Sequence, residues 1–406
     1  MEKQRGDIKF SKRGDALIGQ EMFHLLDLSE NLERKGKHVY HLELGDPKNY
    51  RGYKNYPPGR VINRTIMSLL NCDVSYTSSS GLLPLRQKLA FYFSEKFAKE
   101  IKIENIVIST ANLLIYQILD IACESRDTVA LFTPAFPSYI ASCKYINATI
   151  HKVPLSINDG FELTNKCIDK AFSVRPKVVF VNSGNNPTGA VYDKEALKYL
   201  LAQAIKHDCW IVSDETYGML CYKKEYFSMI NLDYEKLVVI SSFSKVFNIP
   251  GYRIGYAIAD PRVANKISLS SSTLYSCLPV FTQEGIIEGI SILDKFAADQ
   301  RKYYKKLSNE CMAILNKSNC LSCIAPISAF YLFIDIRKLK TNDRLFCSRL
   351  LEEYRTVVTP GSSFGYDGFI RASICGNIDD VKNGLRRIVS FAKLLESKNT
   401  NNYGGR

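Results

Sequence analysis

Short apolar segments alternate with helix-like segments between about residues 82 and 260, and this alternation limits the possible folds more than any other feature of the chain. The apolar segments are largely β-branched and lie at 106–109, 129–132, 177–181, 210–213 and 237–241. Helix-like stretches lie between several of them, at 112–124, 162–172 and 193–207. Short buried strands that alternate with helices are typical of a mainly parallel α/β sheet. The sequence therefore predicts such a sheet for the middle of the chain.

The two ends of the chain have a different pattern. Residues 14–36 predict a helix, and residues 38–44 predict a short strand that ends in the turn sequence Gly45-Asp46-Pro47. Residues 48–60 predict irregular structure. The last third predicts a long helical stretch at 280–317, strands at 329–335, 356–359 and 369–374, helices at 342–353 and 378–396, and a loose tail at 398–406. This second pattern indicates a smaller α+β unit.

The composition is that of a folded globular protein. Of 406 residues, 46% are apolar and 23% are charged, which excludes a wholly disordered chain. No apolar run reaches the ~18 residues of a membrane-spanning helix, and the first residues contain no apolar secretory region. Twelve cysteines are scattered, and the only close pair, Cys320 and Cys323, has no second pair or histidine at ligand spacing. We therefore expect free thiols, a cytoplasmic location and no metal site.

The net charge of +13 is dispersed, without a basic arm or an aromatic-and-basic RNA-binding motif. A lysine-rich solvated surface accounts for this charge better than a nucleic-acid or membrane partner does. The chain also lacks a G-x-S-x-G motif, a P-loop, a G-x-G-x-x-G motif and histidines spaced for a metal. The usual hydrolase, nucleotide-hydrolysing and dinucleotide-binding functions therefore lose their main support.

Three unusual polar loops follow predicted strands. Asn186-Pro187-Thr188-Gly189 follows 177–181, Asp214 and Tyr217 follow 210–213, and Ser242-Phe243-Ser244-Lys245 follows 237–241. Taken singly, such residues are usually a turn, a helix N-cap or a solvated lysine. The carboxyl ends of parallel strands share one edge, where open α/β sheets bind ligands. The three loops together therefore predict a ligand site at that edge.

These loops, with Arg253 eight residues after Lys245 and Arg371 near the C-terminus, resemble the motifs of the class I/II aminotransferases of fold type I, which depend on pyridoxal phosphate. The resemblance covers about residues 40–390. It implies an α/β fold with a mainly parallel, seven-stranded-type sheet in a large cofactor-binding domain at 46–290. It also implies a smaller domain made of residues 1–45 and 291–406, and a homodimer.

The resemblance assigns the reacting groups. Lys245 would bind the cofactor as a Schiff base and then move a proton, because burial and nearby cations can lower the pKa of a lysine. Asp214 would face the pyridine nitrogen and keep the ring protonated, so that the ring can accept electrons. Asn186 and Tyr217 would hydrogen-bond the phenolic oxygen of the ring. Lys245, Asp214 and Tyr217 are thus the expected catalytic residues.

The resemblance also implies a phosphate site. Ser242 and Arg253 match the family's phosphate positions, and the turn that contains Ala111 and Asn112 would direct backbone N–H groups at the same oxygens. Ala111 departs from the pattern, because the family usually has glycine there. Tyr76 matches a tyrosine that family members donate to the phosphate site of the neighbouring subunit.

Two further residues complete the implied site. Phe136, just beyond a predicted strand, matches the aromatic residue that stacks on the cofactor ring. Arg371 lies in an otherwise apolar strand, where a buried arginine needs an anionic partner. In the family this position binds the substrate carboxylate through two hydrogen bonds, with Gly45 and Asn186 beside it.

The resemblance therefore implies an aminotransferase that passes an amino group from an amino acid to a 2-oxo acid in two half-reactions, a ping-pong mechanism. Members that use aspartate carry a second arginine where this chain has Ser272, so we expect a donor with a neutral side chain. Arg51 or Arg60 is an alternative partner for a distal carboxylate. A β-eliminating lyase or another carbanion enzyme would use the same groups. A non-catalytic ligand-sensing domain is a third alternative, which the presence of all the reacting groups disfavours.

Overall fold

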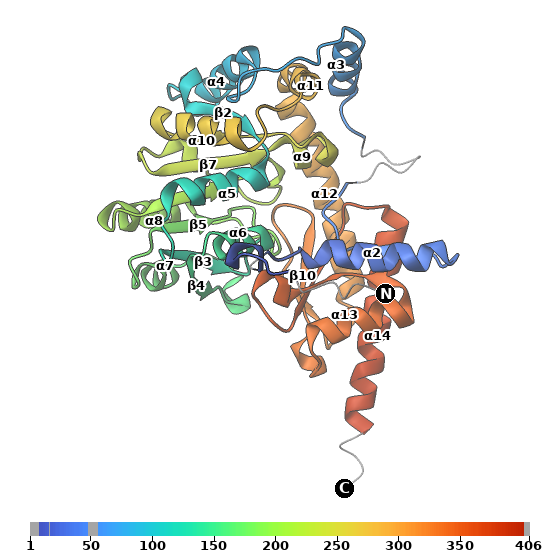
Figure 1. Cartoon of the computed structure of the whole chain (residues 1–406). Helices are drawn as coiled ribbons and strands as arrows, with labels where there is room; N and C mark the ends of the chain where they lie inside the picture. The colour runs from blue at the N-terminus through green and yellow to red at the C-terminus, as the bar shows by residue number, and fades with distance from the viewer. Residues whose placement is uncertain (1–7, 16, 48–55, 402–406) are drawn as a thin grey trace, which may run out of the picture.

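The computed structural model describes residues 8–15, 17–47 and 56–401. Its centre is a seven-stranded sheet in the order β2-β8-β7-β6-β5-β3-β4 (Figure 1). The strands are β2 (Ile106–Ser109), β3 (Thr128–Thr133), β4 (Thr149–Pro154), β5 (Val178–Val181), β6 (Trp210–Asp214), β7 (Leu237–Ser242) and β8 (Gly255–Ile258). All run parallel except β8, which is antiparallel to both of its neighbours. The mainly parallel sheet that the sequence predicts is confirmed.

Helices cover both faces of this sheet. One face packs against α5 (Ala111–Ala122), α6 (Pro137–Tyr145) and α10 (Pro261–Leu274), and the other against α4 (Leu83–Phe97), α7 (Asn165–Phe172) and α8 (Lys194–Lys206). Successive strand residues point to opposite faces. In β3, for example, Leu131 joins one core and Phe132 the other. Burial on both faces explains why the strands are uninterrupted apolar segments.

A second, antiparallel sheet has the strand order β12-β13-β10-β9. Its strands are β9 (Ser322–Cys323), β10 (Tyr331–Asp335), β12 (Thr359–Pro360) and β13 (Phe369–Ser373), and its core includes α12 (Leu293–Leu315), α13 (Asp343–Tyr354) and α14 (Ile378–Asn401). The N-terminal segment lies against this part of the molecule. α2 (Glu21–Arg34) runs beside it, and β1 (Tyr40–His41) pairs in parallel with β11 (Thr356–Val357) (Figure 1).

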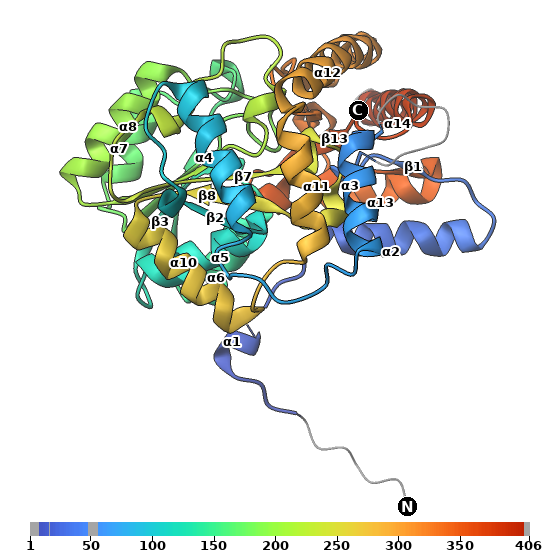
Figure 2. The same cartoon turned by 90° about the horizontal axis from the view of Figure 1, so that it is seen from above.

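The predicted helix at 280–317 is wrong as a single element, because it is two helices, α11 (Val280–Ile290) and α12. α11 packs on α3 (Gly59–Leu70) so closely that a Cβ atom at Gly285 or Gly289 would collide with Thr65 or Val61. α12 instead packs into the core of the second sheet. The chain therefore turns between the two helices (Figure 2).

Four smaller predictions are also corrected. The helix expected at 14–36 is α1 (Lys12–Asp15) followed by α2. The strand expected at 38–44 pairs only at Tyr40–His41. Beyond it, the side chains of Thr359 and Arg371 donate hydrogen bonds to the carbonyl oxygen of Glu43, which is therefore not paired with a neighbouring strand. The irregular segment expected at 48–60 falls partly outside the described residues, and α3 already begins at Gly59. The tail predicted to be loose at 398–406 is helical as far as Asn401, because adding a residue to a formed helix costs less free energy than starting a helix, and residues 402–406 lie outside the described residues.

Within the described residues, no helix is long and apolar enough to cross a membrane.

Candidate active site

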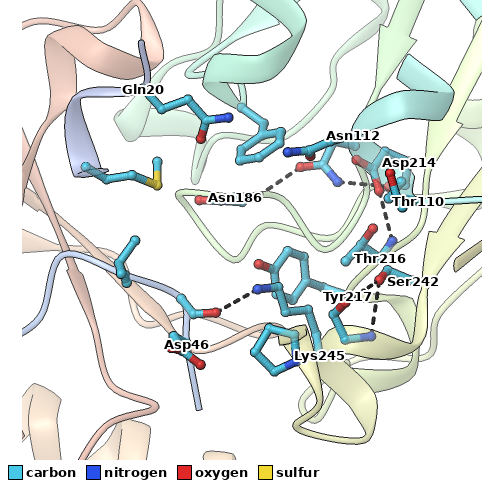
Figure 3. Close-up of a pocket in the computed structure, with 18 of the residues that line it drawn as sticks. Gln20, Asp46, Thr110, Asn112, Asn186, Asp214, Thr216, Tyr217, Ser242 and Lys245 are labelled. Atoms are coloured by element: carbon cyan, nitrogen blue, oxygen red, sulfur yellow. Dashed lines mark hydrogen bonds between the residues drawn. The ribbon is translucent and has the colours of Figure 1, made fainter. Parts of the chain in front are cut away.

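A cavity opens at the carboxyl ends of the parallel strands, between the large sheet and the second sheet, and eleven of the twelve predicted site residues line it. Those eleven are Gly45, Ala111, Asn112, Phe136, Asn186, Asp214, Tyr217, Ser242, Lys245, Arg253 and Arg371. Figure 3 shows Thr110, Asn112 and Asp214 on one side of the cavity, and Gln20 and Asp46 on the other. The loops after β5, β6 and β7 thus meet at one edge of the sheet, as their sequence positions predict.

Asp214 ends β6 and is buried. The Tyr139 hydroxyl donates a hydrogen bond of 2.7 Å to its Oδ2 atom, and the Thr216 backbone N–H donates one of 3.0 Å to Oδ1. Burial raises the pKa of the Asp214 carboxyl, while the hydrogen bonds from Thr216 and Tyr139 lower it and leave a net increase. Asp214 is therefore a carboxylate held in a dry site by fixed donors, and it can face a cationic ring nitrogen there.

Lys245 lies in α9 (Phe243–Val246), directly after β7. Its Nζ atom donates a hydrogen bond of 2.7 Å to the carbonyl oxygen of Gly45 (Figure 3). Burial lowers the pKa of this amine, which increases the fraction of its neutral, nucleophilic form. Gly45 has no space for a side chain, because a Cβ atom would overlap the hydroxyl of Tyr331. The absence of that side chain lets the main chain reach the lysine.

Tyr217 follows β6 and lies 2.6 Å from Tyr331, hydroxyl to hydroxyl. The Ser328 hydroxyl fixes the main chain here by donating a hydrogen bond of 3.0 Å to the Tyr217 carbonyl oxygen. Burial raises the pKa of Tyr217 well above its usual value, so the phenol keeps its proton. It is thus available as a hydrogen-bond donor within the cavity.

Arg371 lies in β13, 1% exposed, with its guanidinium at the cavity wall. Its Nη1 atom donates a hydrogen bond of 3.0 Å to Asn186 Oδ1, and Nη2 donates to the carbonyl oxygen of Glu43. The guanidinium also stacks over the ring of Tyr331 at 4.5 Å. No carboxylate of the described residues pairs with Arg371, and its Nε atom has no partner among them. A buried guanidinium in this state is suited to binding an anion.

The N-terminus of α5 faces the cavity from the side opposite the second sheet. Thr110 caps this helix, with its Oγ1 atom accepting from Leu113 N at 3.3 Å, and Ala111 and Asn112 begin it with ordinary helical geometry. The departure from glycine at Ala111 therefore does not disrupt the turn. Helix N-termini bind phosphate through their free N–H groups.

Ser242, Ser244 and Arg253 add polar groups to the same part of the cavity wall. The Ser242 hydroxyl accepts a hydrogen bond from the backbone of Ser244 at 3.1 Å. Arg253 is solvent-exposed and donates to the carbonyl oxygen of Pro250 at 2.8 Å. A cation and hydroxyls beside a helix N-terminus form a site for a phosphate group.

The remaining predicted residues lie elsewhere. Tyr76 is 88% exposed and does not line the cavity of its own chain. Ser272 is an exposed residue of α10 whose hydroxyl donates to Leu269. Arg60 forms an ion pair of 3.3 Å with Glu288 on the surface, away from the cavity. Arg51 lies outside the described residues.

One wall of the cavity was not predicted from the sequence. Gln20, Met22, Phe23 and Leu44, all from the N-terminal segment, line it. The Gln20 amide donates a hydrogen bond of 2.9 Å to the Ser138 hydroxyl on α6, which attaches this segment to the large sheet's side. Tyr139 and Tyr331 were also missed. Tyr139 had one available signal, since it stands one helical turn after Phe136.

The cavity offers a complementary group for each part of pyridoxal phosphate. Lys245 would meet the aldehyde, Asp214 the ring nitrogen, and Tyr217 the phenolic oxygen. Phe136, which precedes α6, would lie on the ring, and the α5 N-terminus with Ser242 and Arg253 would hold the phosphate. The residues present therefore fit this cofactor. In the part of the chain that the structure describes, no three His, Cys, Asp or Glu side chains form a metal site, and Cys320 and Cys323 are free thiols.

Comparison with known proteins identifies the family. The family model described as aminotransferase class I and II matches residues 49–388. An aspartate aminotransferase of Thermotoga maritima is 29% identical over 364 residues, 89% of this chain and 93% of that protein. A putative aminotransferase of Bacillus subtilis is 31% identical over 339 residues, 82% of this chain and 87% of that protein.

Solved structures agree. The aspartate aminotransferase of Thermus thermophilus with maleate has a TM-score of 0.88 and 25% identity, over 95% of this chain and 100% of that chain. The family model spans most of the sequence. The chain therefore belongs to the class I and II aminotransferase family.

Proposed function

We propose that this aminotransferase moves an amino group from an amino acid with a neutral side chain to a 2-oxo acid, in two successive half-reactions. Enzymes of this family use pyridoxal phosphate. When bound, this cofactor supplies an aldehyde that takes up the amino group and a ring that accepts electrons. The observation that carries the proposal is a partly buried amine, Lys245, in the same cavity as a buried carboxylate, Asp214, and a buried guanidinium, Arg371.

Lys245 serves as the cofactor anchor and the proton carrier in this proposal. Its lowered pKa supports both roles, because a neutral amine attacks an aldehyde and also accepts a proton. Its hydrogen bond to the Gly45 carbonyl oxygen directs the amine toward the wall that the N-terminal segment forms. Asp214 stabilises positive charge on the ring nitrogen, and Tyr139 keeps the carboxylate oriented.

Arg371 binds the substrate's α-carboxylate in this proposal. Asn186 and the Glu43 carbonyl oxygen hold the guanidinium from two directions, so it need not reorganise when the anion arrives. Bidentate binding would fix the orientation of the amino acid relative to Lys245.

The charges along the cavity support a donor with a neutral side chain. Among the described residues that line it, the cations are Lys245, Arg253 and Arg371, and each already has a proposed partner. The wall from the N-terminal segment is neutral apart from Asp46, which would repel a second carboxylate. A buried charge without a partner is strongly unfavourable. Several relatives are named aspartate aminotransferases, so aspartate is the donor that must be compared.

A two-stage amine-transfer assay tests the function. The cofactor-loaded protein is first given one amino acid alone, and each site is expected to release one equivalent of the 2-oxo acid. A different 2-oxo acid is then added and is expected to appear as its amino acid. Release of ammonia without an acceptor would instead indicate an eliminating lyase.

Lys245→Ala is the matched loss-of-function variant for this assay. It is expected to abolish both stages and the covalent adduct that borohydride traps. Lys236→Ala is the control. Lys236 directly precedes the first residue of β7, at the end of the strand opposite to Lys245, and forms an ion pair with Asp208. A Lys245→Ala protein that transfers amine at a near-normal rate would overturn the assignment.

A further inference from the structure

Tyr331 is close to three residues of the proposed site: Tyr217, Arg371 and Gly45. It begins β10, is 2% exposed and lines the cavity. Its hydroxyl lies 2.6 Å from that of Tyr217, the proposed partner of the ring's phenolic oxygen. Its ring lies under the Arg371 guanidinium at 4.5 Å, and its hydroxyl fills the space beside Gly45.

The hydrogen bond between the two tyrosines has a direction. Each hydroxyl has one proton, so one oxygen donates and the other accepts. If Tyr217 donates its proton toward the cofactor, as the proposed function requires, its oxygen can only accept from Tyr331. We propose that Tyr331 is a positioning residue that donates a hydrogen bond to Tyr217 and thereby strengthens Tyr217's donation to the phenolic oxygen.

The surroundings of Tyr331 keep it a donor. The charged and titratable groups that act on it are Arg371 on β13, Cys375 just after that strand, Tyr217 after β6 and Asp46 in the N-terminal segment. Burial raises the pKa of the Tyr331 hydroxyl to about 12 despite the opposing effect of Arg371. The phenol therefore retains its proton across the range in which an enzyme of this kind works. Consecutive hydrogen bonds in a dry site reinforce one another.

The test is a pH titration of the cofactor's absorbance in the loaded enzyme, before any substrate is added. A donor to the phenolic oxygen stabilises its anionic form, so loss of the donor moves the midpoint to higher pH. Tyr331→Phe removes only the hydroxyl and is expected to raise the midpoint by about 0.5 pH unit, less than Tyr217→Phe does. Tyr192→Phe, a buried tyrosine outside the cavity, is expected to leave it unchanged.

The double variant makes the test specific. In the Tyr217→Phe background, Tyr331→Phe is expected to cause no further shift, because its effect passes through the Tyr217 hydroxyl. An unchanged midpoint in the single variant, or an equal shift in both backgrounds, would overturn the inference. The inference rests on the proposed function, and the two fail differently. A protein that binds no cofactor refutes both, whereas one that transfers amine but shows no coupled shift refutes only the role of Tyr331.

Discussion

Arg371 combines full burial with contacts that leave it free to bind an anion, so its removal should affect the substrate more than the cofactor. Arg371→Leu is expected to raise the apparent KM for the amino acid at least about 30-fold, because losing a desolvated charged partner costs roughly 2 to 5 kcal/mol. Arg371→Lys keeps the positive charge but cannot form the two parallel hydrogen bonds. Its apparent KM should therefore lie between those of the unsubstituted protein and Arg371→Leu. Steady-state kinetics and cofactor titration measure both effects. A change in KM under threefold would place carboxylate binding elsewhere.

Glu215, next to Asp214, should make stability depend on pH. Its buried carboxylate accepts from Ser213, Ser228 and the Met229 backbone, yet burial still raises its pKa from 4.5 to about 7. Between about pH 4.5 and 7 the folded chain therefore binds a proton that the unfolded chain has lost. The free energy of unfolding contributed by this group falls as pH rises through that window, by about 3 kcal/mol in all.

Glu215→Gln removes that proton while keeping the shape of the side chain. Relative to the unsubstituted protein, the variant is expected to gain stability as pH rises from 5 to 8. Urea unfolding at several pH values measures the difference, in which the effects of all other groups cancel. A difference in the free energy of unfolding between the two proteins that stays constant from pH 5 to 8 would contradict the prediction.

Three of the residues that the sequence predicted correctly as cavity-lining share one property. Asn186, Asp214 and Lys245 each lie at or beyond the carboxyl end of a parallel strand, so chain position alone places them at one edge of the sheet. Their roles toward the cofactor remain predictions. Tyr331 and Gln20 reach the cavity only through packing between distant segments, and nothing in their local sequence distinguishes them from core or surface residues.

At the scale of elements, α2 is the part of the site least visible in the sequence. It places Met22 and Phe23 in the cavity wall, while Leu28, farther along the helix, is exposed and lies outside it. Met22→Arg would add a cation where the proposed donor's side chain lies. Aspartate use, measured as kcat/KM relative to a neutral amino acid, is expected to rise at least about tenfold, since one ionic partner is worth over 1.4 kcal/mol in such a site.

Leu28→Arg adds the same charge to the same helix without entering the cavity. It is expected to leave the donor preference unchanged. Equal effects of the two substitutions would show that α2 does not determine specificity. An unsubstituted protein that uses aspartate tenfold better than every neutral amino acid would refute the proposed donor class itself.

Helices and strands could be predicted from the sequence where a single hydrophobic pattern continues along their whole length. β2, β3, β5, β6 and β7 are buried on both faces and were found within two residues of their ends. The break between α11 and α12 was not predictable, because both halves are helical and only their different partners require the turn. The two-residue strands β1 and β11 are too short to carry an alternating pattern.

At the scale of the whole molecule, the large sheet and the second sheet are two structural units that pack against separate cores, while the predicted division into domains at residues 46 and 290 remains a prediction. The cavity lies between these units, so its walls come from both. A site of this kind depends on how the units are held together, which local sequence patterns do not specify.

One face of the molecule predicts a homodimer. α3 exposes Ile66, Met67, Leu69 and Leu70, which are 45 to 71% accessible, and Val74 and Tyr76 continue this apolar face. The segment that carries Tyr76 is fixed to α10, because Ser79 and Ser80 both hydrogen-bond Ser268 at 2.8 Å. Tyr76 thus projects from a firm support away from its own cavity. Several exposed apolar side chains on one helix and the segment after it are typical of an interaction site.

We expect two chains per particle in solution, with each Tyr76 reaching the phosphate site of the other chain. Leu70→Asp, which places a charge in the apolar face, is expected to shift the protein toward monomer by light scattering. It should also weaken cofactor binding at least about tenfold, because each phosphate site would lose a hydrogen-bond donor to a charged group. Leu345→Asp replaces an equally apolar residue, 53% exposed on α13, and should change neither property. A monomer that retains full activity would contradict both the assembly and the shared site.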